Sequence, residues 1–176
     1  GVATVSGFPN VNLFQTQNVA RASTYGFELG GEYRFSPENS GFSLISALGL
    51  TVGDNLTTNQ PLETVDPIKL VTGLRYRAPE NLWGADLIAT FAGQSRLASN
   101  RPVNSYTPQG YTVVDLTGFY KITPRLTLNL GVFNLLNNQY FLYSDVRSLI
   151  TVPAPTDLAR FAQPGISLRA GLTFLF

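Results

Sequence analysis

The chain has 176 residues, of which 13% are charged, and its formal net charge is +1 at pH 7. This length is enough for one or two domains, and so few charges argue against nucleic-acid binding, which needs a basic patch or stripe. Cysteine and histidine are both absent, which excludes a disulfide framework, a thiolate metal site, and the commonest general base and metal ligand.

Residues 1–20 hold Gly, Pro, Asn, Gln and Ser between scattered apolar residues, and they predict the tail of a long loop, with a short strand near 12–19 as an option. The chain has no methionine and no signal-peptide pattern at its start, so we expect a piece of a longer polypeptide or a processed form. No run of about eighteen apolar residues exists, so no transmembrane helix is predicted.

From residue 21 onward, apolar and polar residues alternate in long segments. The first segment puts Tyr25, Phe27 and Leu29 on one face and charged residues on the other, which is typical of a strand with two different faces. The same alternation predicts strands at 23–35, 42–53, 67–77, 84–95, 110–122, 125–136 and 166–176. The last strand has one wholly apolar face and ends on Phe176.

The connections between these strands alternate in length. The short ones are 36–41, 78–83 and 123–124, and the long ones are 54–66, 96–109 and 137–164. Short periplasmic turns, longer extracellular loops and aromatic girdles are typical of outer-membrane barrels, and strands of about ten to twelve residues suit a tilted spanning strand. The sequence therefore predicts an all-β fold, an antiparallel meander of about seven long strands that forms an arc of a transmembrane β-barrel. A soluble β-sandwich or β-helix is the alternative.

Charged residues recur on the face opposite the apolar one. A charged group that faces lipid costs about 2–4 kcal/mol, so this face is expected to line the barrel lumen. There it could line a substrate path, or its charges could simply pair with one another. The lumen candidates are Glu28, Glu32, Arg34, Lys69, Arg75, Asp86, Asp115, Lys121 and Arg169. Arg34 and Arg77 are expected near the rim, where their side chains would reach into water.

Aromatic residues in or beside the long loops could stack on a flat ligand or grip a protein carrier, or they could belong to a girdle or pack the loops. They are Tyr106, Tyr111, Tyr140, Phe141 and Tyr143. Asp54, Glu63 and Asp66 could form an acidic patch for a cation or a solvated loop. No catalytic constellation is present, and neither a metal site nor a cofactor site is predicted.

Several segments together resemble TonB-dependent outer-membrane receptors. Residues 25–33 and 110–116 resemble their strands, 134–140 (NLLNNQY) matches a recurring asparagine-rich segment, and 163–176 matches their closing strand. Segments 67–85 and 143–147 resemble the branch of haemoglobin, transferrin and haem receptors.

The resemblance implies that residues 1–176 are the C-terminal part of one barrel domain of about 22 strands, with 1–20 as a loop tail and 21–176 as its last strands. The plug domain and the contact with TonB would lie outside this chain. The implied function is active uptake of an iron compound, haem or a haem protein first and a siderophore second, and the chain would not be an enzyme.

The implied location is the outer membrane of a Gram-negative bacterium, with the C-terminus in the periplasm and Phe176 as the signal for assembly. The implied partners are outer-membrane lipid, the upstream barrel and plug of the same protein, and the TonB complex. One alternative is a small structural or adhesive barrel, although bacterial single-chain barrels have even strand numbers. Another is an outer-membrane lipase or protease, against which the absence of histidine counts.

Overall fold

The computed structural model describes residues 21–101, 106–147, 149 and 155–176. The optional strand near 12–19 lies outside these residues. The strands are β1 Ala22–Arg34, β2 Gly41–Asn55, β3 Gln60–Pro61, β4 Lys69–Arg77, β5 Trp83–Ala92, β6 Tyr111–Thr123, β7 Leu126–Phe133 and β8 Ser167–Phe174. The short helical turns are Pro79–Asn81, α1 Tyr143–Val146, α2 Pro155–Leu158 and Ala159–Phe161. None of the described helices is long and apolar enough to cross a membrane.

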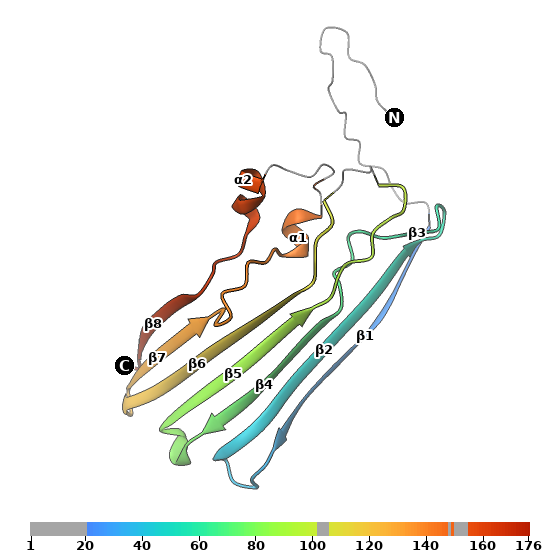
Figure 1. Ribbon diagram of the computed structural model, residues 1–176. Coiled ribbons are helices and arrows are strands. Elements are labelled where there is room, and N and C mark those ends of the chain that lie inside the picture. The colour runs from blue at the N-terminus through green and yellow to red at the C-terminus, as the bar shows by residue number, and fades with distance from the viewer. Residues whose placement is uncertain (1–20, 102–105, 148, 150–154) are drawn as a thin grey trace.

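The strands form one antiparallel sheet in the order β1-β2-β4-β5-β6-β7-β8, and the two-residue β3 pairs only with β2 (Figure 1). The predicted meander of seven long strands is confirmed, and β3 is an addition within the predicted loop 54–66. The long loops, α1 and α2 gather at one end of the sheet, and the C-terminus lies at the other end with the short turns (Figure 1).

Strand pairing sorts the side chains into two faces, as the alternation predicted. One row that crosses the sheet contains only apolar or aromatic residues: Tyr33, Leu44, Leu74, Leu87, Leu116, Val132 and Leu168. The adjacent row on the opposite face contains Arg34, Ser43, Arg75, Asp86, Thr117, Gly131 and Arg169. A slip of one residue between any two paired strands would exchange the two faces. The segregation of charge therefore depends on the observed register.

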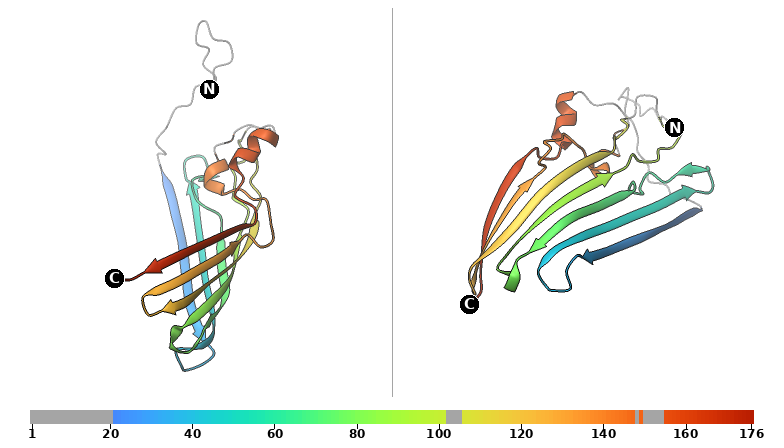
Figure 2. Two further views of the ribbon diagram at one scale, coloured as in Figure 1. Left: turned by 90° about the vertical axis from the view of Figure 1, so that its left-hand side faces the viewer. Right: turned by 60° about the horizontal axis from the view of Figure 1, so that its bottom comes forward.

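The sheet is curved (Figure 2), and exposure indicates which face is concave. Ser43 and Val113 are only 5% and 6% exposed and lie on the charged face, together with the buried strand glycines, such as Gly73 and Gly84. On the apolar face, Leu168 is 77% exposed. The charged face is therefore the crowded, concave one. Among the described residues, the buried hydrophobic side chains are only Ala78, Val113, Tyr143 and Val146.

Aromatic side chains form a belt on the convex face at the end with the short turns. The rings of Tyr76 and Phe42 lie 4.9 Å apart, and those of Tyr76 and Trp83 lie 4.8 Å apart. Tyr33 and Phe35 form a further edge-to-face pair at 5.3 Å. Aromatic rings at this position are typical of the border between lipid and water, so the belt marks one edge of the apolar band.

Candidate functional site: the concave face and the loop cluster

Five charged side chains form a continuous chain across the concave face near the short turns. Glu32 lies between two arginines, with 3.7 Å to Arg34 Nε and 3.5 Å to Arg75 Nη1. Asp86 likewise lies between Arg75 Nε at 3.0 Å and Arg77 Nη1 at 2.9 Å. Arg75 thus links β1 to β5 across β2, at the point where Ser43 is buried.

Arg77 is held more tightly than the sequence suggested. It was expected to reach into water at the rim, but its Nη1 and Nη2 donate to the two carboxylate oxygens of Asp86 at 2.9 and 3.0 Å. Its guanidinium also lies 5.3 Å from the ring centre of Phe119. Gly84 permits this placement, because a Cβ there would meet Arg77 Nη1 and the Phe119 ring, both at 2.8 Å. Arg77 does lie at the end of β4 beside the short turn, but the expectation that its side chain reaches into water is wrong.

The nine predicted lumen residues all lie on the concave face, but only Glu32, Arg34, Arg75 and Asp86 form the chain. Glu28 and Lys69 share a row and are separated by Gly49. Arg169 lies over the ring of Phe133 at 4.8 Å.

Two more of the nine lie toward opposite ends of β6. Lys121 pairs with Thr127 near the short turn. Asp115 accepts a hydrogen bond from the backbone N–H of Asn134 at 2.8 Å, so it anchors the end of β7.

Replacing Asp86 by Asn in the intact barrel should lower the free energy of unfolding by about 1–3 kcal/mol, because two arginines lose a charged acceptor in a half-buried place. Arg34→Gln is the matched control, since the Arg34 side chain is 61% exposed and its ion pair is long. It should cost at most about 1 kcal/mol. Urea unfolding, monitored by heat-modifiable gel mobility, gives both values. Equal losses for the two variants would contradict the central role of Asp86 in the charge chain.

The long loops meet at Glu63, in the loop between β2 and β4. One carboxylate oxygen of Glu63 accepts the backbone N–H of Ala98 at 3.0 Å, and the other accepts Arg101 Nη1 at 3.2 Å. The carbonyl of Glu63 accepts the Tyr143 hydroxyl at 2.8 Å. In addition, Arg147 Nη1 donates to the Thr64 carbonyl at 3.0 Å. Residues from two other long loops thus converge on two consecutive residues, Glu63 and Thr64, and we call this arrangement the loop cluster.

The aromatic loop candidates occupy different environments. Tyr143 is only 6% exposed and packs inside the loop cluster. Tyr106 and Phe141 form an edge-to-face pair at 6.1 Å. Tyr140 stacks on Tyr111 at 4.5 Å, and Tyr111 lies at the start of β6 on the concave side, in one row with Ala92 and Lys69. Burial raises the pKa of Tyr106 and of Tyr140 above the usual value.

Burial, and then the charge of Glu63, raise the pKa of Tyr143 above the ordinary value of 10.0. The folded state therefore favours the neutral hydroxyl, and the contribution of Tyr143 to stability is fully present below about pH 10 and is lost as the pH rises through the folded pKa. We expect the loop cluster to loosen in that window and become more sensitive to protease. Tyr143→Phe should lack this alkaline step, and an identical profile in the variant would contradict the assignment.

Asn134 explains why β7 ends at Phe133, three residues before the predicted end at 136. Its φ is 54°, a left-handed conformation that Asn tolerates better than most residues. Its side chain is buried, and its Nδ2 donates to the carbonyls of Asn138 and Pro164 at 2.9 and 3.0 Å. Its Oδ1 accepts the backbone N–H of Asn138 at 3.0 Å. Asn134 thus holds the turn and ties it to the approach to β8.

The next two asparagines extend this arrangement to the neighbouring strands. Asn137 Oδ1 accepts the backbone N–H of Ile166 at 3.0 Å, just before β8. Asn138 Nδ2 donates to the Thr112 carbonyl in β6 at 2.8 Å. These amides replace strand pairing beyond the end of β7, so the asparagine-rich segment supports the base of the loops.

The acidic loop residues do not form an open patch. Asp54 pairs with Arg96 at 2.9 Å, and Glu63 pairs with Arg101. Within residues 21–101, 106–147, 149 and 155–176, no group of three or more acidic, histidine or cysteine residues is placed to hold a metal ion. At the other end of the molecule, Phe176 is fully exposed, and its ring lies 6.5 Å from that of Phe174.

Comparison with known proteins gives a consistent picture. Residues 2–135 match the model of a family described as TonB dependent receptor-like, beta-barrel. A probable haemoglobin and haemoglobin-haptoglobin-binding protein of Haemophilus influenzae is 28% identical over 92% of this chain and 18% of its own length. A haemoglobin-haptoglobin utilization protein of Neisseria meningitidis is 25% identical over 88% of this chain and 22% of its own length. The chain thus spans about a fifth of these relatives.

Solved structures share the fold. The copper transporter OprC aligns with a TM-score of 0.72 at 22% identity, over 88% of this chain and 23% of its own. The ferripyoverdine receptor of the outer membrane of Pseudomonas aeruginosa aligns with a TM-score of 0.61 at 17% identity, over 87% of this chain and 19% of its own. At these identities the likeness concerns the fold alone.

Proposed function

Because the chain belongs to the TonB-dependent receptor-like β-barrel family, we propose that it is the C-terminal barrel segment of an outer-membrane receptor for active uptake of an iron compound. Haem or a haem protein is the first candidate and a ferric siderophore the second. The observation that carries the proposal is the segregation of charge across seven paired strands: every charged strand residue except Asp54, at the loop end of β2, lies on the concave face. A tilted sheet with these faces is suited to lipid outside and a polar lumen inside.

The order of preference for the ligand rests on the relatives. The two relatives described above are named for binding or utilisation of haemoglobin and haptoglobin, and a transferrin-binding protein of Neisseria meningitidis is 31% identical over 51% of this chain and 11% of its own length. Receptors and transporters, and not enzymes, make up this family. The chain supplies no histidine to ligate haem iron, so any histidine ligand would come from residues outside it.

The proposed orientation follows from the lengths of the connections. The short turns and the C-terminus would lie in the periplasm, and the loop cluster would lie outside the cell. The concave charge chain would then face a plug supplied by upstream sequence of the same protein, and TonB would act through that part. Phe176 would serve as the assembly signal, and residues 1–20 would be the tail of a preceding loop.

Within this proposal, Tyr106, Tyr140 and Phe141 are the aromatic candidates for ligand contact. Their rings pair at the loop end of the molecule. Tyr143 would serve to pack the loops, because it is buried and its hydroxyl is already donated to Glu63.

Growth assays test the proposal. A strain from which the gene is deleted should fail to grow on haemoglobin as its only iron source, while growth on ferrous salt should be unchanged. Complementation with the intact gene should restore growth, and Tyr140→Ala with Phe141→Ala should reduce it more than Leu56→Ala, a change at an exposed loop residue. If the deletion strain grew as well as the wild type on haemoglobin, haem and ferric siderophores, the proposal would be contradicted.

A further inference from the structure

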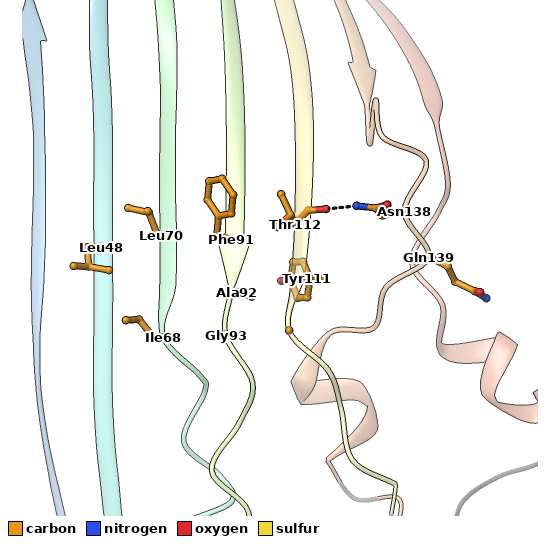
Figure 3. A pocket seen from close by; sticks show the side chains of 11 residues that line it. Leu48, Ile68, Leu70, Phe91, Ala92, Gly93, Tyr111, Thr112, Asn138 and Gln139 are labelled. Atoms are coloured by element: carbon orange, nitrogen blue, oxygen red, sulfur yellow. Dashed lines mark hydrogen bonds between the residues drawn. The ribbon is translucent and has the colours of Figure 1, made fainter.

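The convex face is hollowed at its loop end. The hollow has a volume of about 630 Å³, within the range of about 300–1,000 Å³ that is usual for small-molecule sites. Leu48, Leu70 and Phe91 line it from β2, β4 and β5, and Thr112 and Asn138 lie beyond them, joined by a hydrogen bond (Figure 3).

Glycines and the early end of β7 create this hollow. Gly93 and Gly110 occupy the outward positions at the loop ends of β5 and β6. A Cβ on Gly93 would meet Ile68 Cγ2 at 2.6 Å, and a Cβ on Gly110 would meet the Ala92 carbonyl oxygen at 2.6 Å. Because β7 ends at Phe133, the loop residue Asn138 lies beside Thr112 in place of a strand residue. The space is therefore kept open by residues that cannot easily be enlarged.

The lining changes character across the sheet. Leu48, Leu70, Phe91 and Thr112 form one row across β2, β4, β5 and β6, and the row ends beside the amide of Asn138, with no charged side chain among the lining residues. An elongated apolar chain with an uncharged hydrogen-bonding group at one end matches this gradient. A flat, water-soluble ligand does not match it, because the apolar end of the hollow opens on the surface that is proposed to face lipid.

We propose that this hollow binds the acyl chain of a membrane lipid, with the ester or amide group of the lipid near Asn138. The inference rests on the proposed function, since it needs the convex face to lie in a bilayer with the loops at its outer surface. The apolar row from Tyr33 to Leu168 lies on the same face as the hollow, and the row of Ser46, Thr72, Ala89 and Val114 lies between the two.

The test measures the lipid that stays with the intact receptor after exhaustive detergent exchange, by native mass spectrometry. We expect on the order of one bound lipid per receptor, and its mass separates a phospholipid from a lipopolysaccharide. Thr112→Phe should fill the hollow and reduce the bound fraction at least tenfold. Ala89→Phe adds the same ring to the same face, outside the hollow, and should leave the bound fraction unchanged.

Equal retention by the wild type and both variants would overturn the proposal, as would a wild type without retained lipid. A photo-crosslinking residue at Leu87, in mid-span on the convex face, separates this failure from failure of the proposed function. If Leu87 crosslinks to lipid in cells, the face lies in a bilayer and only the hollow is refuted. If Leu87 crosslinks to protein or not at all, the location itself is wrong.

Discussion

Residues 1–176 produced alone should not close into a stable barrel. In the described sheet, β1 pairs only with β2, and β8 pairs only with β7, so each has an edge of unpaired N–H and C=O groups. In a bilayer every such unpaired group costs several kilocalories per mole. The curvature of the sheet (Figure 2) also describes an arc, whose edges lie apart.

We expect the isolated chain to aggregate or to remain dependent on detergent, without heat-resistant gel mobility and without channels in planar bilayers. The matched control is the same chain expressed together with the remaining barrel sequence of its receptor, which should restore both properties. A heat-resistant monomer with discrete conductance, formed by the isolated chain, would contradict the arc and would favour the small self-contained barrel.

Asn134→Leu should be among the most destabilising single substitutions in this chain, at roughly 3 kcal/mol or more. The change removes three side-chain hydrogen bonds to the backbone of Asn138 and Pro164, each contributing about 0.5–1.5 kcal/mol. Leucine at φ 54° adds backbone strain of about 1–3 kcal/mol.

Two controls separate these causes. Asn59 has the same φ of 54° but is exposed in a loop, so Asn59→Leu should show the backbone strain alone. Asn134→Gly removes the side chain without the strain. Urea unfolding of the intact receptor in vesicles should give the largest loss for Asn134→Leu, and losses within error of one another for all three variants would refute the role of the amide.

The strands and their faces could be predicted from the sequence because alternation with a period of two is a local property. Glu32 and Arg34 were assigned to the lumen in this way, and the structure places them on the concave face. The predicted strand boundaries differ from the observed ones by a few residues, mostly at the loop ends, where alternation fades into turns.

The partners of these residues could not be predicted, because they depend on the register between strands. Arg77 meets Asp86 only because β4 and β5 pair as they do and because Gly84 leaves room for its side chain. Tyr143 donates a hydrogen bond to Glu63, which lies 80 residues earlier in the chain, and no local sequence pattern indicates this contact. The asparagines of 134–138 did offer a signal, since Asn favours turns and left-handed backbone, but that signal does not reveal that the amides bridge three strands.

Adjacent residues of β6 test directly which face of the sheet meets lipid. Leu116 belongs to the apolar row and Thr117 to the charged row, and this chain has no cysteine to interfere with labelling. Spin labels at Leu116→Cys and Thr117→Cys in the reconstituted receptor should differ sharply: the first accessible to oxygen in the bilayer, the second to a water-soluble nickel complex. Equal accessibility at both positions, or the reverse order, would contradict a lipid-facing convex surface.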